Sequence, residues 1–517
     1  MPGAGNLHGM PAPRLNRPLW LEHADSRYPA LEGDVEVDVA VIGAGITGAT
    51  AAHLLKQAGL RVALLETSRV AFGATGYTTA KLTVGHNLVY RSLTESHGAH
   101  VARRYARSNQ EAIERVAALV AEHGIECDFE RASNYVYTED EASAGELERE
   151  AEAARAAGIS AELTTETDLP YPVAAAIRVE NQAQFHPWRY VAALARLVDG
   201  DGSHVFERTR ATGVRSDARC RVETAGGAVT AGHVVVATQL PFLDRGLFFA
   251  KAHPTKSYAV AATVPAEDAP RGMYITSDEP TRSVRSAPAG DRRRALIVGG
   301  ESHKPGTDPH AGERYERLEA FLRERFGVAE AEHRWSTHDY VPVDELPYIG
   351  RLRRGDDRVL VATGFAKWGM TKGTLAAAIL TDAILGRPSE YADLYDSTRF
   401  DPARSARRFA RENGQVGARF VGARVRPRPG REDVERLAPG EGTIARIGGR
   451  QYAVHRDEAG ELHVLSARCT HLGCIVGWNP ADRAWECPCH GSRFAADGTL
   501  VQGPATADLD RRSLPGR

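Results

Sequence analysis

The sequence predicts an α/β domain with a parallel sheet, interleaved with an antiparallel α+β part and followed by a small all-β module. Three observations predict this fold class. A strand, glycine turn, helix and strand follow one another from Val39 to Glu66; residues 254–334 alternate apolar and polar positions between turn signals; and short strands with two Cys/His loops follow Glu432. At 517 residues the chain has room for two to four domains, given roughly 100 to 200 residues per domain.

The composition shows no bias toward nucleic acid or membrane. Hydrophobic residues make up 42% of the chain and charged residues 26%, with a formal net charge of -2. This balance offers no global basic excess for nucleic acid or an anionic membrane. Residues 1–36, an N-terminal lead-in, contain no apolar run that suits a signal peptide or a membrane span. We therefore expect a cytoplasmic protein with no nucleic-acid partner and no transmembrane segment.

The unit from Val39 to Glu66 has the features of a dinucleotide-binding turn. Gly43 permits the tight turn, Gly45 lets the backbone approach a pyrophosphate, and Gly48 lets the helix lie close to the strand. The helix N-terminus then faces the phosphates, and Glu66 ends the second strand where a ribose hydroxyl needs an acceptor. Glycines also serve ordinary turns, but here all five features are in register, so the sequence predicts dinucleotide binding.

The segments that follow supply a cofactor wall and a scaffold. Residues 68–81 are rich in Gly and Thr and can lie against a flat cofactor. Residues 88–157 have helical spacing with a strand at 134–137, and residues 212–238 contain strands that rejoin the first sheet. Residues 254–334 suit an antiparallel sheet over a cavity.

A second glycine-rich turn, residues 364–373, connects a strand at 359–363 to a helix at 375–385. The N-terminus of this helix offers unpaired N–H groups and a positive dipole end, which could stabilise negative charge on a reduced cofactor. A simple strand-to-helix connection is the alternative.

Four segments together resemble FAD-dependent oxidoreductases of the D-amino-acid oxidase and glycine/sarcosine oxidase group. They are the nucleotide turn, Gly73 to Lys81, Val234 to Thr238 and Leu346 to Thr371. The resemblance covers about residues 37–395. It implies a Rossmann-type FAD domain interleaved with an antiparallel α+β substrate domain. The FAD part would be about 37–87, 180–245 and 335–395, and the substrate part about 88–179 and 246–334.

By this resemblance, the nucleotide turn would hold the ADP half of FAD, the threonines after Gly73 would approach the pyrophosphate and ring, and residues 364–371 would lie at the pyrimidine edge. Only one such fingerprint is visible, which counts against a pyridine-nucleotide-linked reductase. No cysteine lies in the block 346–371, so we expect non-covalent FAD, with a histidyl link left open. The expected FAD-binding residues are Gly43, Gly45, Gly48, Glu66, Gly73, Thr75, Thr78, Thr79, Val214, Gly364, Gly369, Met370 and Thr371.

Residues 396–432 form an arginine-rich linker. We expect a helix followed by an extended segment. It would be a solvated face or a strap docked on the acidic flavin domain, and an electrostatic landing site for an acidic redox partner is the alternative. The arginines before Arg431 in this linker are Arg399, Arg404, Arg407, Arg408, Arg411, Arg419, Arg424, Arg426 and Arg428.

Four of the six cysteines lie within the module at 433–517, in two loops that each carry a thiol and an imidazole. Such a mixed donor set is what a Rieske [2Fe-2S] cluster needs, with Cys469 and Cys487 on one iron and His471 and His490 on the other. A four-coordinate zinc site could use the same side chains. The C-x-H and C-x-x-H spacing, with an extra cysteine in each loop, favours the cluster.

Residues 433–510 resemble the Rieske family. The resemblance implies a disulfide between Cys474 and Cys489, and a third, lid-forming loop at Gly503 to Ala505. Ser492 stands where high-potential members bond a cluster sulfur, whereas Phe494 replaces their tyrosine. Because each lost donor destabilises the reduced cluster, we expect a potential in the middle of the roughly -150 to +300 mV Rieske range.

A two-electron flavin fused to a one-electron centre suits an enzyme that oxidises a substrate and exports electrons singly. The flavin-family resemblance points to C–N oxidation of an amine or amino acid, with an unidentified one-electron acceptor. An electron-transfer relay without an organic substrate is the alternative. A Rieske oxygenase is a third idea, weakened because no mononuclear site of two histidines and a carboxylate is visible.

Residues that could contact a substrate are polar or aromatic and lie in segments expected to face the flavin, although each could equally be structural. Where amino-acid-oxidising relatives commonly place a cation for the substrate carboxylate, this chain has Thr371 beside Lys372. The substrate therefore need not carry a carboxylate. The candidates are Lys256, Tyr258, Arg282, Arg285, His338, Lys367 and Trp368.

Overall fold

The computed structural model describes residues 14–15, 17–399, 402–425 and 427–515. A six-stranded sheet of order β19-β20-β13-β3-β4-β9 forms the first part, and all its pairs are parallel except β19 with β20. Its strands are almost entirely apolar and buried, as expected for a sheet covered on both faces. They are β3 (Val39–Ile42), β4 (Val62–Leu65), β9 (His204–Phe206), β13 (His233–Val236), β19 (Tyr348–Arg351) and β20 (Val359–Thr363).

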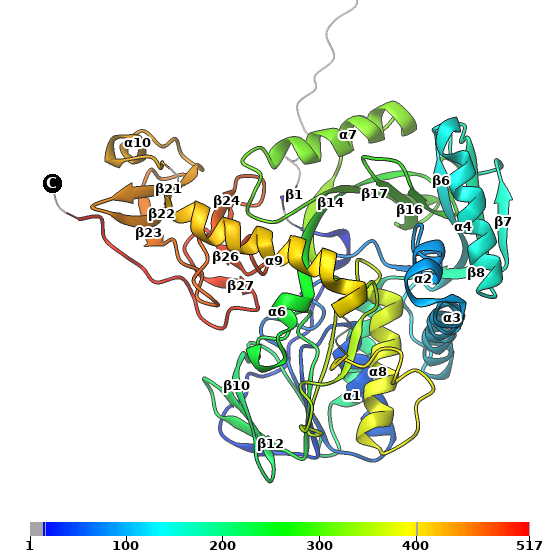
Figure 1. Ribbon diagram of the computed structural model, residues 1–517, viewed down its shortest axis with the longest axis horizontal. Helices are drawn as coiled ribbons and strands as arrows, with labels where there is room; N and C mark the ends of the chain where they lie inside the picture. The colour runs from blue at the N-terminus through cyan, green and yellow to red at the C-terminus, as the bar shows by residue number, and fades with distance from the viewer. Residues whose placement is uncertain (1–13, 16, 400–401, 426, 516–517) are drawn as a thin grey trace, which may run out of the picture.

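Helices cover one face of this sheet and a small sheet covers the other (Figure 1). The helices are α1 (Ile46–Gln57), α5 (Pro187–Val198) and α8 (Gly369–Ile384), and α1 packs against both others. The small sheet, whose apolar residues share a core cluster with the parallel strands, consists of β2 (Val35–Glu36), β10 (Ala211–Ser216), β11 (Cys220–Thr224) and β12 (Ala228–Ala231).

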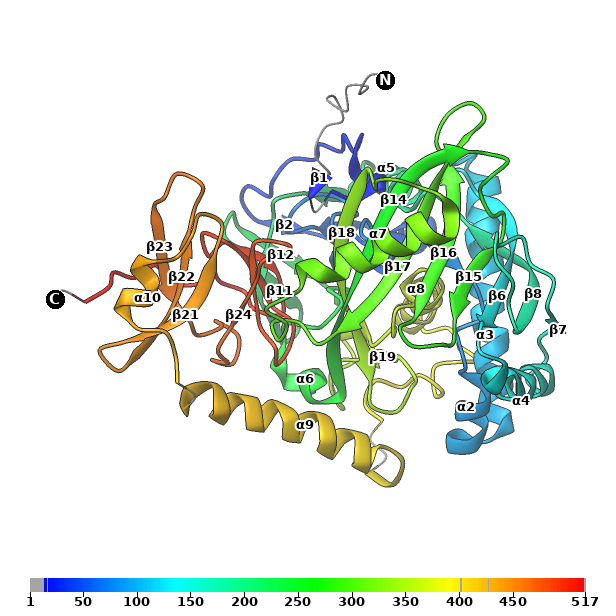
Figure 2. The same cartoon turned by 90° about the horizontal axis from the view of Figure 1, so that it is seen from above.

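A ten-stranded, largely antiparallel sheet forms the second part, with helix α7 (Gly312–Phe326) packed on it. The sequence pattern missed strand β8 (Ala175–Gln184), because its polar end at residues 180–182 breaks the apolar run. Helices α2 (Tyr90–His97), α3 (Ala99–Glu122) and α4 (Ala144–Ala156) lie at the end away from the C-terminal module (Figure 2). The other strands are β1 (Arg14–Leu15), β5 (Lys81–Leu82), β6 (Glu130–Thr138), β7 (Ala161–Thr164), β14 (Ala252–Pro265), β15 (Met273–Thr276), β16 (Arg282–Pro288), β17 (Arg293–His303) and β18 (His333–Pro342).

The C-terminal module contains two small antiparallel sheets. The first consists of β21 (Gly442–Ile447), β22 (Arg450–Arg456) and β23 (Leu462–Ser466), preceded by the short helix α10 (Arg431–Glu435). The second consists of β24 (Gly477–Asn479), β25 (Ala484–Glu486), β26 (Arg493–Ala495) and β27 (Leu500–Gln502). The two Cys/His loops precede β24 and connect β25 to β26.

The linker is dominated by one long helix, α9 (Pro402–Val425), which runs from the first two parts to the module (Figures 1 and 2). Arg426 lies outside the described residues, as do the side chains of Arg404 and Arg407 and residues 1–13 and 16 of the lead-in. None of the helices in the described ranges is long and apolar enough to cross a membrane.

The glycine turn after β3 requires residues that have no Cβ atom. Gly43 has a φ of +102°, and a Cβ there would lie 2.7 Å from the carbonyl oxygen of Ala237. A Cβ on Gly48 would lie 1.8 Å from the carbonyl oxygen of Gly43, which is too close for any side chain. Helix α1 therefore approaches the turn closely enough to direct its N-terminus at the space above β3.

We predict that Gly48→Ala lowers the free energy of unfolding by about 3 kcal/mol, because the new methyl group pushes α1 from the turn. The variant should also lose bound flavin, measured by absorbance after gel filtration. Gly145→Ala in α4 is the control, because its Cβ would meet only the flexible end of Arg149 at 3.6 Å. Full flavin content in Gly48→Ala would contradict the expectation.

Candidate functional site

A cavity of about 610 Å³ lies where the three parts meet. The turns after β3 and β4, strands β14, β17 and β18, and the module's residues 482–484 and 501–506 all contribute to its wall. Nine of the expected FAD-binding residues line this cavity: Gly43, Gly45, Glu66, Gly73, Thr75, Thr78, Thr79, Gly369 and Met370.

The other four expected FAD-binding residues lie behind the cavity wall. Gly48 faces the turn, and Gly364, with a φ of +79°, packs on Pro342. Val214 is buried in β10, where its carbonyl accepts a hydrogen bond from Arg245 at 2.8 Å. The Thr371 hydroxyl accepts from the Thr83 amide at 3.1 Å and donates to the Thr83 carbonyl at 3.2 Å. None of these four residues is among those that line the cavity.

The nucleotide end of the cavity presents backbone amides and one carboxylate. The Thr75 hydroxyl accepts from the amide of Ile46 at the start of α1, at 3.0 Å. Glu66 accepts from the amides of Ala44 and Ser68, each at 2.9 Å, and burial raises the pKa of its carboxyl against these contacts. A helix N-terminus beside a turn without side chains fits the pyrophosphate of a dinucleotide.

Of the candidates for substrate contact, Tyr258, His338 and Lys367 line the cavity, whereas Lys256 and Arg285 do not. The Lys367 amine donates to the Ser302 hydroxyl at 2.5 Å, and burial lowers its pKa. Arg285 donates to the carbonyls of Thr79 and Ala80, at 3.0 and 2.8 Å, and therefore holds the cofactor wall. Burial lowers the pKa of Arg285 to about 9.

Of the two remaining candidates, one lines the cavity and the other does not. Trp368 lines the cavity and stacks on His86, with ring centroids 4.7 Å apart, whereas Arg282 forms an ion pair with Glu301 at 2.7 Å. Two ionisable residues that sequence reasoning did not single out, Lys81 and Asp339, also line the cavity. Burial lowers the pKa of Lys81 well below its usual value and raises that of Asp339 to about 6.

The two Cys/His loops bring their four expected cluster ligands together. Cys469 and Cys487 are buried and free, and the side chains of His471 and His490 lie with ring centroids 5.0 Å apart. The Nδ1 atoms of both histidines are buried and have no hydrogen-bond partner among the described residues. Two thiols and two unpartnered imidazole nitrogens are the donor set of a Rieske cluster, so these residues fit one.

The extra cysteine of each loop forms the disulfide Cys474–Cys489, as the Rieske resemblance implies. The sulfur of Cys487 lies within 4.8 Å of both disulfide sulfurs. The bridge therefore ties the loops together directly beside the ligand set.

The first two parts of the chain cover the imidazole rings of the loops. His471 Nε2 lies 2.8 Å from a carboxylate oxygen of Asp244, and the ring of Phe249 lies 5.5 Å from that of His490. The Tyr340 hydroxyl donates to the backbone carbonyl of His490 at 2.9 Å. His338 Nδ1 lies 3.0 Å from the carbonyl oxygen of Gly491.

The module docks on one face of the β14–β18 pair. Lys256 pairs with His338 across the two strands, and Tyr258 with Ser336, so these four side chains share a face. Tyr258 accepts a hydrogen bond from Asn479 of the module at 3.3 Å, and its hydroxyl lies 3.0 Å from His303 Nε2.

Buried charges dominate this contact. Lys256 forms ion pairs with Asp482 and Glu486, and Arg493 lies 3.1 Å from Asp482. All these side chains are 8% exposed or less. Burial alone would raise the pKa of both carboxyls, but the facing cations, Lys256 foremost, lower them. We call these four residues the docking network.

We predict that Lys256→Met lowers the free energy of unfolding by about 3 to 5 kcal/mol, because it leaves two buried carboxylates with one cation. Urea unfolding at pH 7 measures it. Arg91→Met, which removes an exposed pair with Glu95, is the control and should cost at most about 1 kcal/mol.

The pH dependence follows from the lowered carboxyl pKa values. Stability from such groups is present above their unfolded pKa and is lost as the pH falls through the folded pKa. The difference between wild type and Lys256→Met should therefore persist at neutral pH and narrow below about pH 4. Equal unfolding of Lys256→Met and Arg91→Met at pH 7 would refute the role of the network.

Ser492 provides a second prediction. A hydrogen bond from Cys487 is the largest contact that lowers the pKa of the Cys469 thiol, and the Ser492 hydroxyl contributes to the same shift. Ser492→Ala should lower the midpoint potential by about 40 mV, because a hydrogen bond of about 1 kcal/mol favours the more negative reduced state. Redox titration followed by EPR measures this shift. Ser466→Ala, which removes a hydroxyl bonded to the Arg468 amide, should leave the potential unchanged, and equal potentials in both variants would be the contrary result.

Comparisons with known proteins match two separate regions of the chain, the first two parts and the C-terminal module. The family described as FAD dependent oxidoreductase matches residues 38–383, and the Rieske [2Fe-2S] domain matches residues 432–513. The Rieske 2Fe-2S iron-sulfur protein YhfW of Bacillus subtilis is 35% identical over 491 residues, which cover 94% of this chain and 95% of that protein.

Two further comparisons concern the first two parts. The gamma-glutamylputrescine oxidoreductase of Escherichia coli is 25% identical, covering 74% of this chain and 91% of that protein. The crystal structure of glycine oxidase from Geobacillus kaustophilus has the same fold, with a TM-score of 0.59 and 21% identity, covering 71% of this chain and all of that one.

Proposed function

Because the chain belongs to the family of FAD-dependent oxidoreductases and carries a Rieske [2Fe-2S] domain, we propose that it is a dehydrogenase for the C–N bond of an amine or amino acid. When bound, FAD accepts two electrons as a hydride equivalent and the cluster carries one electron at a time to an external acceptor. The names of the E. coli and Geobacillus relatives support nitrogen-containing substrates as the class.

One observation carries this proposal: a single cavity is lined both by the nucleotide turn and by the third loop of the Rieske domain. Gly43, Gly45 and residues 501–506 all line it. A flavin held by the nucleotide turn would therefore share its cavity with the domain that holds the cluster. This arrangement supports electron transfer within one chain.

The residues of the chain would bind the substrate and exclude water. Lys81 and Lys367 are the lysines of the cavity wall, and burial lowers the pKa of each, so either can hold an anionic group or accept a proton. Lys372 does not line the cavity. It is buried, with its amine 5.4 Å from the centre of the Tyr105 ring, and burial lowers its pKa to about 7. Among the lysines, a substrate carboxylate would therefore bind through Lys81 or Lys367, and Arg210, Arg483 and Arg493 are the arginines of the same wall. The cytoplasmic location stays a prediction from the sequence.

The proposal is tested by adding glycine, sarcosine, proline, putrescine and gamma-glutamylputrescine to the anaerobic holoprotein, with NADH as a control. We expect one amine to bleach the flavin absorbance and then to produce the EPR signal of a reduced Rieske cluster. Cys487→Ser, which removes a cluster ligand, should retain bleaching and lose the signal. If no amine bleaches the flavin but NADH or a reduced carrier protein reduces the cluster, the chain is an electron relay and the C–N chemistry is wrong.

A further inference from the structure

The imidazole edges of the cluster ligands are closed to an external partner. The His471 side chain is only 4% exposed, because Asp244 covers its Nε2. His490 is buried between Phe249 and the strand that carries Tyr340. The flavin-binding parts of this chain therefore occupy the face through which the imidazoles would otherwise reach the solvent. An electron that leaves the cluster for another protein needs a different surface.

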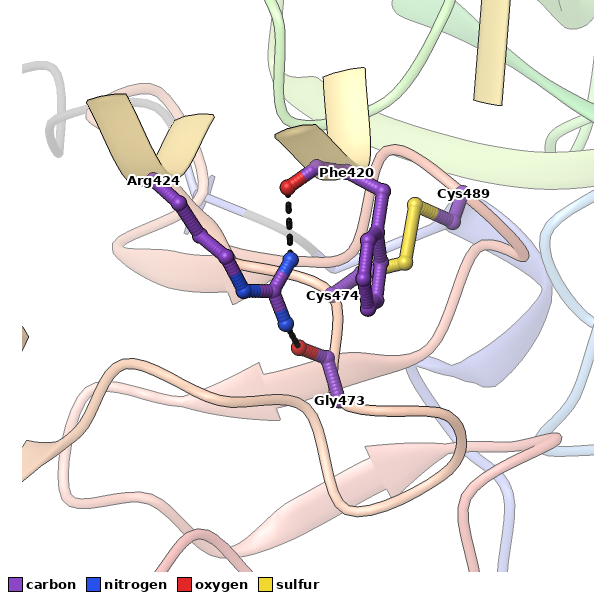
Figure 3. Close-up of a disulfide and its surroundings, with 5 residues drawn as sticks. All are labelled: Phe420, Arg424, Gly473, Cys474 and Cys489. Carbon is purple, nitrogen blue, oxygen red and sulfur yellow. Dashed lines mark hydrogen bonds between the residues drawn. A yellow bond between two sulfur atoms is a disulfide. The ribbon is translucent and has the colours of Figure 1, made fainter. Parts of the chain in front are cut away.

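The other side of the first Cys/His loop is open and apolar. Leu472, which directly follows the ligand His471, is 41% exposed, and Phe420 on α9 is 37% exposed. Figure 3 shows the Phe420 ring beside the disulfide and the loop at Gly473. Among the described residues, only six large hydrophobic side chains are exposed to this degree, and Leu472 and Phe420 are two of them. The two side chains lie on segments that the hydrogen bond from Arg424 to Gly473 joins, and a contiguous exposed apolar patch can mark an interaction site.

Two cations flank these apolar side chains. Arg424 donates to the carbonyl of Gly473 at 2.9 Å and lies over the Phe420 ring, 3.5 Å from its centroid (Figure 3). Arg468 is exposed. Its backbone forms an isolated antiparallel β-bridge with Ile475, the residue that follows Cys474 of the disulfide.

Neither cation has an acidic partner among the described residues, whereas Arg411, earlier on α9, pairs with Glu412. Asp244, the carboxylate nearest to the loop ligands, is engaged by His471. The charge left at this surface is therefore positive.

We propose that Phe420, Arg424, Arg468 and Leu472, here named the exit surface, are the docking site for an acidic one-electron carrier protein. An apolar centre with a charged rim is the usual anatomy of a transient protein interface, and unpaired cations favour a partner of opposite charge. Leu472 and Gly473 join the ligand His471 to Cys474, so a carrier seated there would be separated from the cluster by one loop. This docking site rests on the proposed function, because a relay protein and a dehydrogenase both need an exit.

The test uses the full holoprotein reduced with dithionite, so that no organic substrate is required. Stopped-flow absorbance and freeze-quench EPR follow re-oxidation of the cluster by ferricyanide, an anionic acceptor, and by tris(phenanthroline)cobalt(III), a cationic one. At low ionic strength, Arg424→Glu and Arg468→Glu should each slow the reaction with ferricyanide at least about threefold and accelerate the reaction with the cobalt complex. Both effects should disappear at high salt, where the charges are screened.

Matched variants separate docking from damage to the cluster. Arg468→Lys keeps the charge and should restore the wild-type rate, and Arg103→Glu on α3, at the opposite end of the molecule (Figure 2), should change neither rate. Calorimetry with the redox-inert hexacyanocobaltate(III) anion should show binding that weakens at least about threefold in both glutamate variants.

Equal ferricyanide rates in wild type and both glutamate variants, an equal effect of Arg103→Glu, or unchanged anion binding would each overturn the proposal. A chain that oxidises no amine but shows the expected charge dependence would refute the dehydrogenase and leave the exit surface standing.

Discussion

The docking network is the constraint on which the rest of the arrangement depends. Lys256 belongs to the substrate-side sheet and Asp482, Glu486 and Arg493 to the Rieske domain, so each side alone would carry charges without their partners. Removing such charges from water is costly unless opposite charges meet them in good geometry. The Rieske domain therefore has one favourable position on the β14–β18 face. The shared cavity wall, the covered imidazoles and the hydrogen bond from Tyr340 to His490 all follow from that position.

Fixing the two redox domains in this way gives the pair of Cys/His loops an inner and an outer side. The inner side carries the histidine rings, and flavin-binding strands and the segment around Phe249 cover it. The outer side carries the disulfide and the exposed Leu472, and α9 borders it. Arg408 of the linker lies 3.7 Å from Glu345, as expected for a strap docked on the flavin part. Arg424 donates to the backbone of the first Cys/His loop.

Local sequence was enough to predict the parts whose residues are close in the chain. The nucleotide turn and the two Cys/His loops each depend on a few positions at fixed spacing, so their chemistry can be predicted without a structure. The docking network is not, because Lys256 and its partners are 226 and 230 residues apart and no local pattern links them. The sequence identifies Lys256, Tyr258 and His338 only as polar or aromatic residues in segments expected to face a flavin. The alternation over residues 254–334 predicts a strand with Lys256 and Tyr258 on one face. The pairing of that strand with His338, and what covers the face, depend on the tertiary fold. Thr371 and Val214 show the same limit for single side chains. The sequence predicts that both bind FAD, but neither lines the cavity: Thr371 bonds to the backbone of Thr83, and Val214 is buried in β10.

The long helix α9 also changes what kind of process links the two redox domains. Separate flavin and iron–sulfur proteins must find each other by diffusion, and their encounters become rarer on dilution. Here α9 and the buried contacts keep the partners together in one chain. Their effective concentration is therefore a property of the molecule, independent of how much protein the cell contains. Only the second encounter, between this chain and its acceptor, responds to abundance, so that step sets how the output of electrons scales with expression.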